Sequence, residues 1–227
     1  MNYEQQNNRV YVSGVIASDP TFSHEVYGEG FFETTMHVER LSEQVDVIPI
    51  TVSERLMQGV EFSVGTRIAL EGQFRSYNKI VDGKSKLMLT VFAREILPVE
   101  PFRNPNTVVL SGYLCKPPVY RTTPFSREIA DLLIAVNRAY NKSDYIPCIA
   151  WGRNARFVRG LSVGDRVSIT GRVQSREYTK RIDDVTSEVR TAYEISVSKI
   201  AVGETDFYED GLFLPITSEA ESIGKPN

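Results

Sequence analysis

The sequence predicts an all-β protein made of two tandem copies of one five-stranded barrel, each with a single short helix. Three observations support this prediction. The chain repeats itself along most of its length, its apolar residues alternate with polar ones as in strands, and a Pro-rich segment separates the two copies. A length of 227 residues suits two domains of roughly 100 residues each.

The repeat is visible at the start of each copy and again after the middle. NRVYVSGVIASDP (8–20) aligns without a gap with NTVVLSGYLCKPP (106–118). With one added residue, SVGTRIALEGQFRS (63–76) aligns with SVGDRVSITGRVQS (162–175). Matches in the same order over two long stretches indicate that one structural unit occurs twice.

The boundary between the copies falls in LPVEPFRNPN, whose three prolines favour a stiff, extended linker. We therefore expect a first domain at 1–97, a linker at 98–105 and a second domain at 106–203. Residues 204–227 hold 6 acidic residues and 1 basic residue, so they form an acidic tail.

The order of elements in the second copy decides between two all-β architectures. A β-β-β-α-β-β order with one long strand after the helix is typical of a five-stranded OB barrel. An immunoglobulin-type sandwich is the alternative, but it needs about seven strands and has no place for the helix. The helix is expected in RNARFVRGL, between the third and fourth strands, and the strands are expected near 107–116, 128–138, 144–152, 165–180 and 188–201.

Composition indicates an ordinary globular protein that works without a membrane or a cofactor. With 41% hydrophobic and 24% charged residues, the chain has no apolar run near the roughly 18 residues that span a bilayer, and its start does not resemble a secretion signal. Cys115 and Cys148 lack metal-type spacing and are expected to be reduced, small apolar residues on strands. We therefore expect a cytoplasmic protein.

Positive charge is concentrated in the second copy. Residues 106–203 hold 15 Lys and Arg against 9 Asp and Glu, whereas residues 1–105 hold 10 against 14. A basic segment between acidic ones indicates where a polyanion would bind.

Strand alternation separates a core face from an outer face on the long strand of the second copy. Val167 and Val173 lie on the apolar face. A solvated surface is the alternative interpretation of the opposite face, but an aromatic ring among its cations favours a ligand. That face carries Arg172, Arg176, Tyr178 and Lys180.

The stretch DYIPCIAWG contains the single tryptophan of the chain. Tyr145 and Trp151 share one face, and small apolar residues occupy the other, which is the expected core side. At ~3.3 Å per residue the two rings are roughly 20 Å apart, so they suit two separate stacking positions. Rings that stack on bases, each worth about 1–3 kcal/mol, and cations that neutralise phosphates together indicate single-stranded nucleic acid.

These motifs resemble the bacterial single-stranded DNA-binding protein (SSB) family. The resemblance covers the second copy, from NTVVLSGYLCKPPVYR through IADLLIAVNRAY and DYIPCIAWGRNARF to VGDRVSITGRVQSREYT. It implies base stacking on strand aromatics and phosphate contacts by neighbouring cations. The implied rings are Tyr140, Tyr145, Trp151 and Tyr178. The cations assigned to the site are Arg121, Arg138, Arg153, Arg172, Arg176 and Lys180.

The first copy departs from this pattern. Its counterparts of Tyr140, Tyr145 and Trp151 are not aromatic, and the remaining candidates are Tyr77, Arg75 and Lys79. We therefore expect a weaker binder or a structural, dimerising unit. A core or hairpin role is expected for Tyr27, Phe31 and Phe32.

The resemblance also implies partners. Family members usually present four OB folds, so a chain with two is expected to form a homodimer. The acidic tail is a candidate docking segment for replication or repair proteins, and the protein is expected to be associated with the nucleoid.

Two other functions remain as alternatives. One is a protein-interaction OB module of a primosome or nucleoid assembly, and the other is single-stranded RNA binding. An enzyme is not expected, because the chain has no convergent catalytic motif around its 2 histidines.

Overall fold

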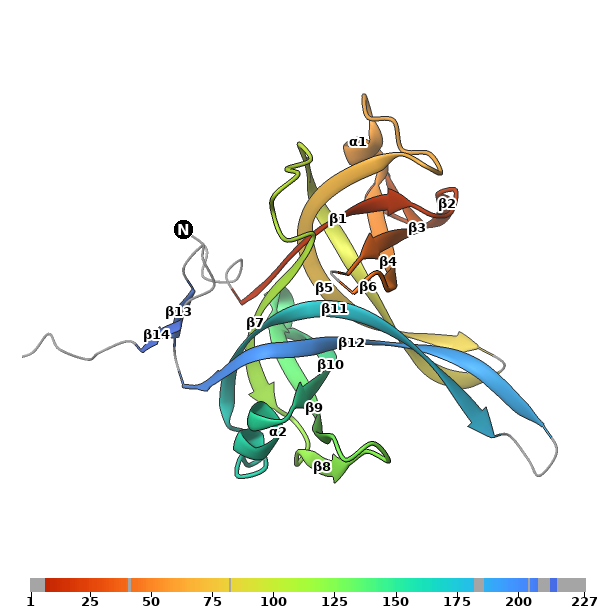
Figure 1. The fold of residues 1–227 in the computed structure, drawn as a ribbon. Coiled ribbons are helices and arrows are strands. Elements are labelled where there is room, and N and C mark those ends of the chain that lie inside the picture. The colour runs from red at the N-terminus through yellow and green to blue at the C-terminus, as the bar shows by residue number, and fades with distance from the viewer. Residues whose placement is uncertain are drawn as a thin grey trace, which may run out of the picture.

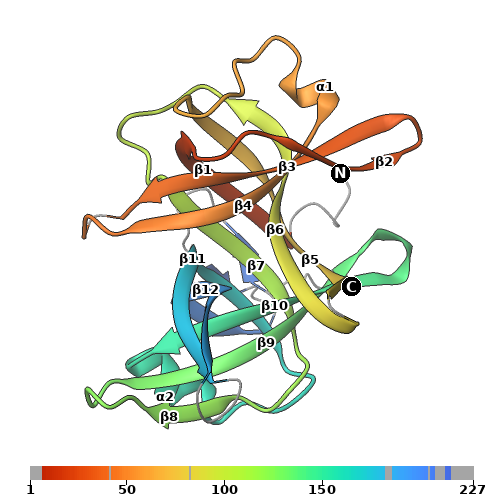
Figure 2. The ribbon, with the colours of Figure 1, turned by 90° about the vertical axis from the view of Figure 1, so that its right-hand side faces the viewer.

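The computed structural model describes residues 7–40, 42–81, 83–181, 186–203, 205–207 and 213–215. Within these residues the main sheet has twelve strands and closes into two barrels. Figures 1 and 2 show the first barrel, coloured red to yellow, above the second, coloured green to blue.

The first barrel closes as a ring of five strands in the order β1-β3-β4-β6-β5, with β5 pairing back onto β1. The β4–β6 pairing is parallel and the others are antiparallel. Its elements are β1 (Asn8–Ile16), β2 (Thr21–Val26), β3 (Glu29–Glu39), β4 (Val45–Ser53), α1 (Glu54–Met57), β5 (Arg67–Val81) and β6 (Lys84–Leu97).

The second barrel repeats this ring as β7-β9-β10-β12-β11, again with a single parallel pairing, between β10 and β12. Its elements are β7 (Asn106–Leu114), β8 (Val119–Thr122), β9 (Glu128–Arg138), the 3-10 turn η2 (Ala139–Asn141), β10 (Lys142–Trp151), α2 (Arg153–Val158), β11 (Arg166–Arg181) and β12 (Ser187–Val202).

These two rings, each with a helix between its third and fourth strands, confirm the predicted tandem OB fold. One detail differs, because each copy has a sixth strand, β2 or β8, paired with the outer edge of β3 or β9. β8 has only four residues, too few for an alternating pattern to reveal it.

Each barrel closes where the backbone of its first strand crosses another strand. Residues Asn8–Val12 of β1 pair with β7, whereas Val15 and Ile16 pair with β3. The change of partner occurs around Gly14, where an added Cβ would lie 2.2 Å from the carbonyl oxygen of His37. Gly112 has the same position in the second copy, which explains why both copies have glycine there.

The β1–β7 pairing joins the two barrels and relates them by an approximate twofold axis. Asn8 is opposite Leu110, and Val12 is opposite Asn106. Since Asn8 and Asn106 are equivalent in the repeat, as are Val12 and Leu110, exchanging the copies leaves the register unchanged. The pairing therefore lies inside one chain and is nearly symmetric.

Two buried aspartates bind the barrels to each other reciprocally. Asp46 of the first barrel accepts a hydrogen bond from the Ser175 N–H of the second (2.9 Å), and Ser175 Oγ accepts one from the Val47 N–H (2.9 Å). Conversely, Asp144 of the second barrel accepts from the Ser76 N–H (2.8 Å), and Ser76 Oγ accepts from the amide that follows Asp144 (2.7 Å). Each barrel thus forms side-chain hydrogen bonds to backbone amides of the other.

An arginine neutralises each of these carboxylates. Both Asp46 and Asp144 are 0% exposed, and a buried charge is tolerated only when it is paired and hydrogen-bonded. Arg40 donates to both oxygens of Asp46 at 2.7 and 2.5 Å, and this carboxylate raises the pKa of Arg40. Arg138 donates to Asp144 at 3.2 Å.

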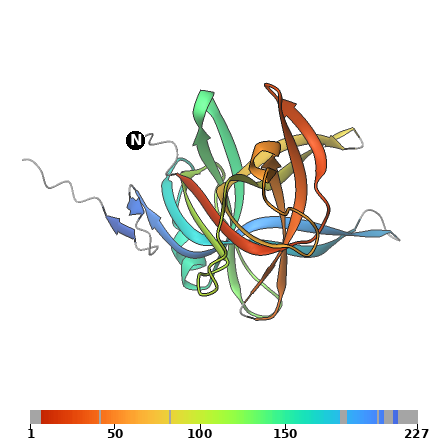
Figure 3. The ribbon, with the colours of Figure 1, turned by 90° about the horizontal axis from the view of Figure 1, so that it is seen from above.

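Beyond the barrels, two strand pairs continue as exposed arms. β5 with β6 and β11 with β12 project on the same side of the molecule (Figures 1 and 3). The side chains of β5 are exposed from Tyr77 onward, and those of β11 from Arg176 onward.

The tail contributes a separate two-stranded sheet of β13 (Thr205–Phe207) and β14 (Phe213–Pro215). The rest of 204–227, proposed as a docking segment, lies outside the described residues. In the part of the chain that is described, no helix has the length and apolar character needed to cross a bilayer.

We expect Asp144→Ala to lower the free energy of unfolding by about 3–5 kcal/mol, because it leaves the Ser76 amide and the Arg138 guanidinium without their buried partner. Chemical denaturation measures this loss. The matched control is Asp131→Ala, which removes an exposed ion pair with Arg121 and should cost less than about 1 kcal/mol. Equal losses for the two variants would contradict a central role for Asp144 at the interface.

Candidate nucleic-acid interface

The outer face of β8, β9 and β10 carries three of the predicted site residues. Strand register places Trp151, Ile129 and Arg121 in one row across the three strands. Neighbouring strands are roughly 4.8 Å apart, so the backbones that carry Trp151 and Arg121 are separated by about 10 Å. Tyr145 lies on the same face of β10, six residues before Trp151.

Both rings of β10 face outward. The exposed fraction is 47% for Tyr145 and 37% for Trp151, while Ile146 and Cys148 on the opposite face are buried in the core. Burial raises the pKa of the Cys148 thiol. Ile149, which also has the outward parity, is only 3% exposed, so neighbouring side chains cover it between the two rings.

Sequence reasoning missed Tyr113, which extends this face. Register places Tyr145, Ala135 and Tyr113 in one row across β10, β9 and β7, and Tyr113 is 40% exposed. The signal was available, because Tyr113 has the outward parity between the buried Leu110 and Leu114. The backbone that carries this second ring is therefore about 10 Å from that of Tyr145, with only the small side chain of Ala135 between them.

The cations near Trp151 differ in what they contact. Arg121 forms an ion pair with Asp131 at 2.9 Å, with both side chains partly exposed. Arg153 is exposed at the first position of α2. Arg156 of the same helix is paired with Glu128. Arg153 is thus the predicted cation in the best position to meet a phosphate beside Trp151.

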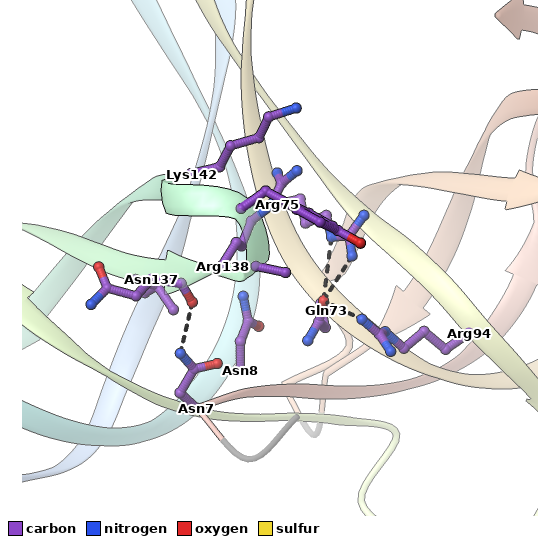
Figure 4. Close-up of a pocket in the computed structure, with 11 residues that line it drawn as sticks. Asn7, Asn8, Gln73, Arg75, Arg94, Asn137, Arg138 and Lys142 are labelled. Atoms are coloured by element: carbon purple, nitrogen blue, oxygen red, sulfur yellow. Dashed lines mark hydrogen bonds between the residues drawn. The ribbon is translucent and has the colours of Figure 1, made fainter. Parts of the chain in front are cut away.

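Tyr140 lies at the opposite end of β10, in the turn η2. The residue is 93% exposed, and its backbone has left-handed angles (φ 60°, ψ 37°), which are uncommon for a non-glycine residue. The turn holds the ring beside a cavity of about 310 Å³ between the two barrels. Figure 4 shows this cavity with Arg75, Arg138 and Lys142 around it.

The predicted residues of β11 divide between the barrel junction and the arm. Arg172 is half-buried at the junction, where burial and then the nearby charge of Arg40 lower its pKa. Arg176, Tyr178 and Lys180 are exposed on the arm. There the Arg176 guanidinium lies 5.7 Å from the Tyr178 ring and 3.3 Å from a carboxylate oxygen of Glu194.

The prediction of a single basic outer face on β11 is therefore only partly matched. Gln174, which shares the parity of Arg172, is 5% exposed and donates a hydrogen bond to Glu194 (2.8 Å). The junction covers the start of this face because the Asp46–Ser175 contact draws the first barrel against it. Sequence alternation cannot show such a contact between domains.

The three predicted residues of the first barrel do not form one cluster. Tyr77 donates its hydroxyl to Glu33 (3.0 Å), and burial, with the charge of Glu33, raises its pKa to about 12. Lys79 is exposed farther along the arm. Arg75 turns instead to the cavity, with its guanidinium 4.0 Å from the centre of the Phe92 ring.

Aromatic rings on the first barrel are arranged differently from the sequence expectation. Phe31 lies on the outer parity of β3, stacked on His24 at 5.0 Å and 5.5 Å from Phe92. Phe32 packs against the core and Tyr27 is fully exposed in a hairpin turn, as expected for core and hairpin residues. The first barrel thus has two partly exposed rings, Phe31 and Phe92, at positions other than those of the missing rings.

The site residues therefore fall into three groups. The outer face of the second barrel holds Tyr145, Trp151, Arg121 and Arg153. The junction holds Tyr140, Arg138, Arg75 and Arg172. The two arms hold Tyr77, Lys79, Arg176, Tyr178 and Lys180. In the described residues, no group of three or more His, Cys, Asp or Glu side chains is placed to hold a metal ion.

Fluorescence can test the surroundings of Trp151, because it is the single tryptophan. We expect acrylamide to quench its emission, since more than a third of the side chain is exposed. Iodide should quench it better than caesium does at low salt, because Arg121 and Arg153 raise the local anion concentration. Emission that none of these quenchers reaches would show that the ring is sealed from solvent.

Comparison with known proteins identifies relatives of the second barrel. Residues 105–202 match the model of the Single-strand binding protein family. Single-stranded DNA-binding protein 1 of Staphylococcus aureus is 41% identical over 80 residues, and Single-stranded DNA-binding protein A of Bacillus subtilis is 38% identical over 80 residues. The alignments cover 32% of this chain and 48% and 46% of those proteins, so the chain spans about half the length of the curated relatives it matches.

Solved structures resemble the whole tandem. The wild-type single-stranded DNA binding protein from Thermus aquaticus has a TM-score of 0.68 at 21% identity, covering 88% of this chain and 94% of that chain. This similarity shows the fold. The N-terminal domain of PriB protein from Thermoanaerobacter tencongensis is 48% identical over 41% of this chain and 97% of that chain, but its TM-score of 0.36 is too low to bear on the fold.

Proposed function

We propose that this chain, whose residues 105–202 belong to the Single-strand binding protein family, binds and protects single-stranded DNA without reading its sequence. The observation that supports this most directly is the outer face of the second barrel. There, Tyr145 and Trp151 expose their rings on one strand, with Arg121 and Arg153 beside them. Membership of this family also indicates that the second barrel binds a ligand and does not catalyse a reaction.

The proposed mechanism combines stacking with charge neutralisation. An unpaired base can lie flat on an exposed ring, which contributes about 1–3 kcal/mol per base and tolerates any base. A base inside a duplex has both faces covered by its neighbours, so these rings select single strands. Lys and Arg side chains then neutralise the phosphates and release counterions, which makes binding depend on salt.

We further propose that the barrels divide the work, with the second unit, 106–203, as the main binding unit. The first unit, 1–97, has no ring at the positions of Tyr140, Tyr145 or Trp151. The linker at 98–105 joins the two units. Phe31 and Phe92 give the first unit an aromatic surface of its own, which suits a secondary contact.

Assembly and partners extend the proposal to the whole protein. Two chains would bring four OB folds together, so a homodimer is the proposed state. The acidic tail at 204–227 is the proposed docking segment for proteins of replication, recombination or repair. Binding to exposed single-stranded DNA would associate the protein with the nucleoid.

A titration with labelled oligothymidylate tests the function. We expect binding far tighter than to a DNA duplex of equal length, with affinity falling as salt rises, at a slope near −0.7 for each phosphate neutralised. Fluorescence anisotropy measures both. Equal affinity for duplex and single strand would contradict the proposal, and tighter binding to an RNA of the same sequence would favour the RNA-binding alternative.

Paired substitutions test the division between barrels. We expect Trp151→Ala with Tyr178→Ala to weaken oligothymidylate binding by about 2–6 kcal/mol, because two stacking rings are lost. Tyr77→Ala should cost much less, because the Tyr77 hydroxyl is hydrogen-bonded to Glu33 within its own barrel. Anisotropy compares the variants, and circular dichroism checks their folding. A loss from Tyr77→Ala as large as from the pair would refute the division.

A further inference from the structure

The cavity beside Tyr140 is built by both barrels. The first barrel contributes the start of β1 with Asn8, the middle of β5 with Gln73 and Arg75, and Arg94 of β6. The second contributes the end of β9, the turn η2 and Lys142. Figure 4 shows side chains from both barrels around one opening.

Positive charge dominates the lining. Among the described residues that line the cavity, four are cations and none is a carboxylate: Arg75, Arg94, Arg138 and Lys142. The nearby Asp144 is fully buried and already accepts from Arg138 and from the Ser76 amide. It therefore offsets one charge and leaves an excess of positive charge.

Two of these guanidinium groups are held in position by one amide. Gln73 Oε1 accepts from Arg75 Nη2 (2.9 Å) and from Arg94 Nη2 (3.0 Å). Burial, followed by the charges of Arg138 and Arg94, lowers the pKa of Arg75 to about 10. Four cations with one carboxylate beside them are suited to an anionic ligand, and phosphate oxygens suit guanidinium donors.

The equivalent position on the other side of the twofold axis is different. The repeat exchanges Gln73 and Arg75 for Arg172 and Gln174, and it places Glu194 where the first copy has Thr90. There Gln174, the counterpart of Arg75, donates a hydrogen bond to Glu194 (2.8 Å), so a carboxylate lies beside this position. This carboxylate makes the related position less suited to an anion than the one beside Tyr140.

Both barrels have aromatic side chains at or near the cationic cavity. Tyr140 of the second barrel exposes its ring at one side. In the first barrel the Arg75 guanidinium lies over the Phe92 ring, and the Phe31 ring is 5.5 Å from that of Phe92. An exposed ring next to a cationic cavity suits a single strand, in which bases alternate with phosphates.

We propose that this cavity binds a backbone phosphate of single-stranded DNA where the strand passes from the second barrel to the first. The flanking base stacks on Tyr140, and the strand continues along the first barrel past Arg75 and Phe92. This inference rests on the proposed function. It adds that one DNA strand contacts both barrels and crosses between them at a single point.

The test compares two charge-matched double variants on two lengths of oligothymidylate. Arg94→Gln with Lys142→Gln removes one exposed cation of the cavity from each barrel and spares Arg138, which the interface needs. Arg67→Gln with Lys116→Gln removes one exposed cation from each barrel outside the cavity lining. The short oligonucleotide has about 8 residues, within the range that one OB fold occupies, and the long one has about 40.

We expect the cavity variant to bind the long oligothymidylate roughly tenfold more weakly than the wild type at low salt, with the salt slope reduced by about 0.7, the value for one phosphate. On the short oligonucleotide, which the second barrel can hold alone, the cavity variant should match the control variant. Circular dichroism and thermal unfolding should show that both variants keep the wild-type fold.

Several outcomes would overturn the inference. One is a cavity variant that equals the control on both lengths, and another is a cavity variant that weakens both lengths equally. Inorganic phosphate that binds the wild type by calorimetry, but not the cavity variant, with unchanged DNA affinity would show a free-anion site instead. If the wild type binds neither oligonucleotide, the proposed function itself fails, and the crossing with it.

Discussion

The reciprocal contact between two buried aspartates and two strand amides is the constraint on which the arrangement of this protein depends. Asp46 reaches Ser175 and Asp144 reaches Ser76, each across the boundary between the barrels. A carboxylate buried without these partners would carry a large desolvation cost, so the barrels cannot shift without breaking several hydrogen bonds at once. The β1–β7 ladder fixes the register, and the aspartates fix the rotation.

This contact also positions the candidate site. Ser76 and Ser175 lie where the two arms leave their barrels, immediately before Tyr77 and Arg176. Asp144 immediately precedes Tyr145. The interactions that hold the barrels together therefore orient the arms and the first exposed ring of β10. A change at the interface would alter binding without touching a binding residue.

Much of the fold could be read from the sequence, because the repeat and the strand alternation are local signals. The parity of DYIPCIAWG is enough to place Tyr145 and Trp151 outside and Ile146 inside. β8 could not be predicted, because four residues are too few to show an alternation of apolar and polar side chains.

The candidate site was less accessible, because part of it belongs to neither domain alone. Arg94 and Lys142 are 48 positions apart and line one cavity only because of the β1–β7 pairing. Arg172 fits an open basic face by alternation, yet the other barrel covers it. The sequence predicts a core or hairpin role for Phe31, because the pattern of β3 does not show that Phe92 of β6 lies beside it.

The pairing of β1 with β7 inside one polypeptide has a consequence for evolution. Two identical subunits related by a twofold axis must carry the same residue at both equivalent positions. Fusion of the two halves removes that obligation, so Gln73 and Arg75 on one side can diverge from Arg172 and Gln174 on the other. The two faces of the duplicated molecule, which a symmetric dimer would keep identical, can therefore differ in the ligand that they bind.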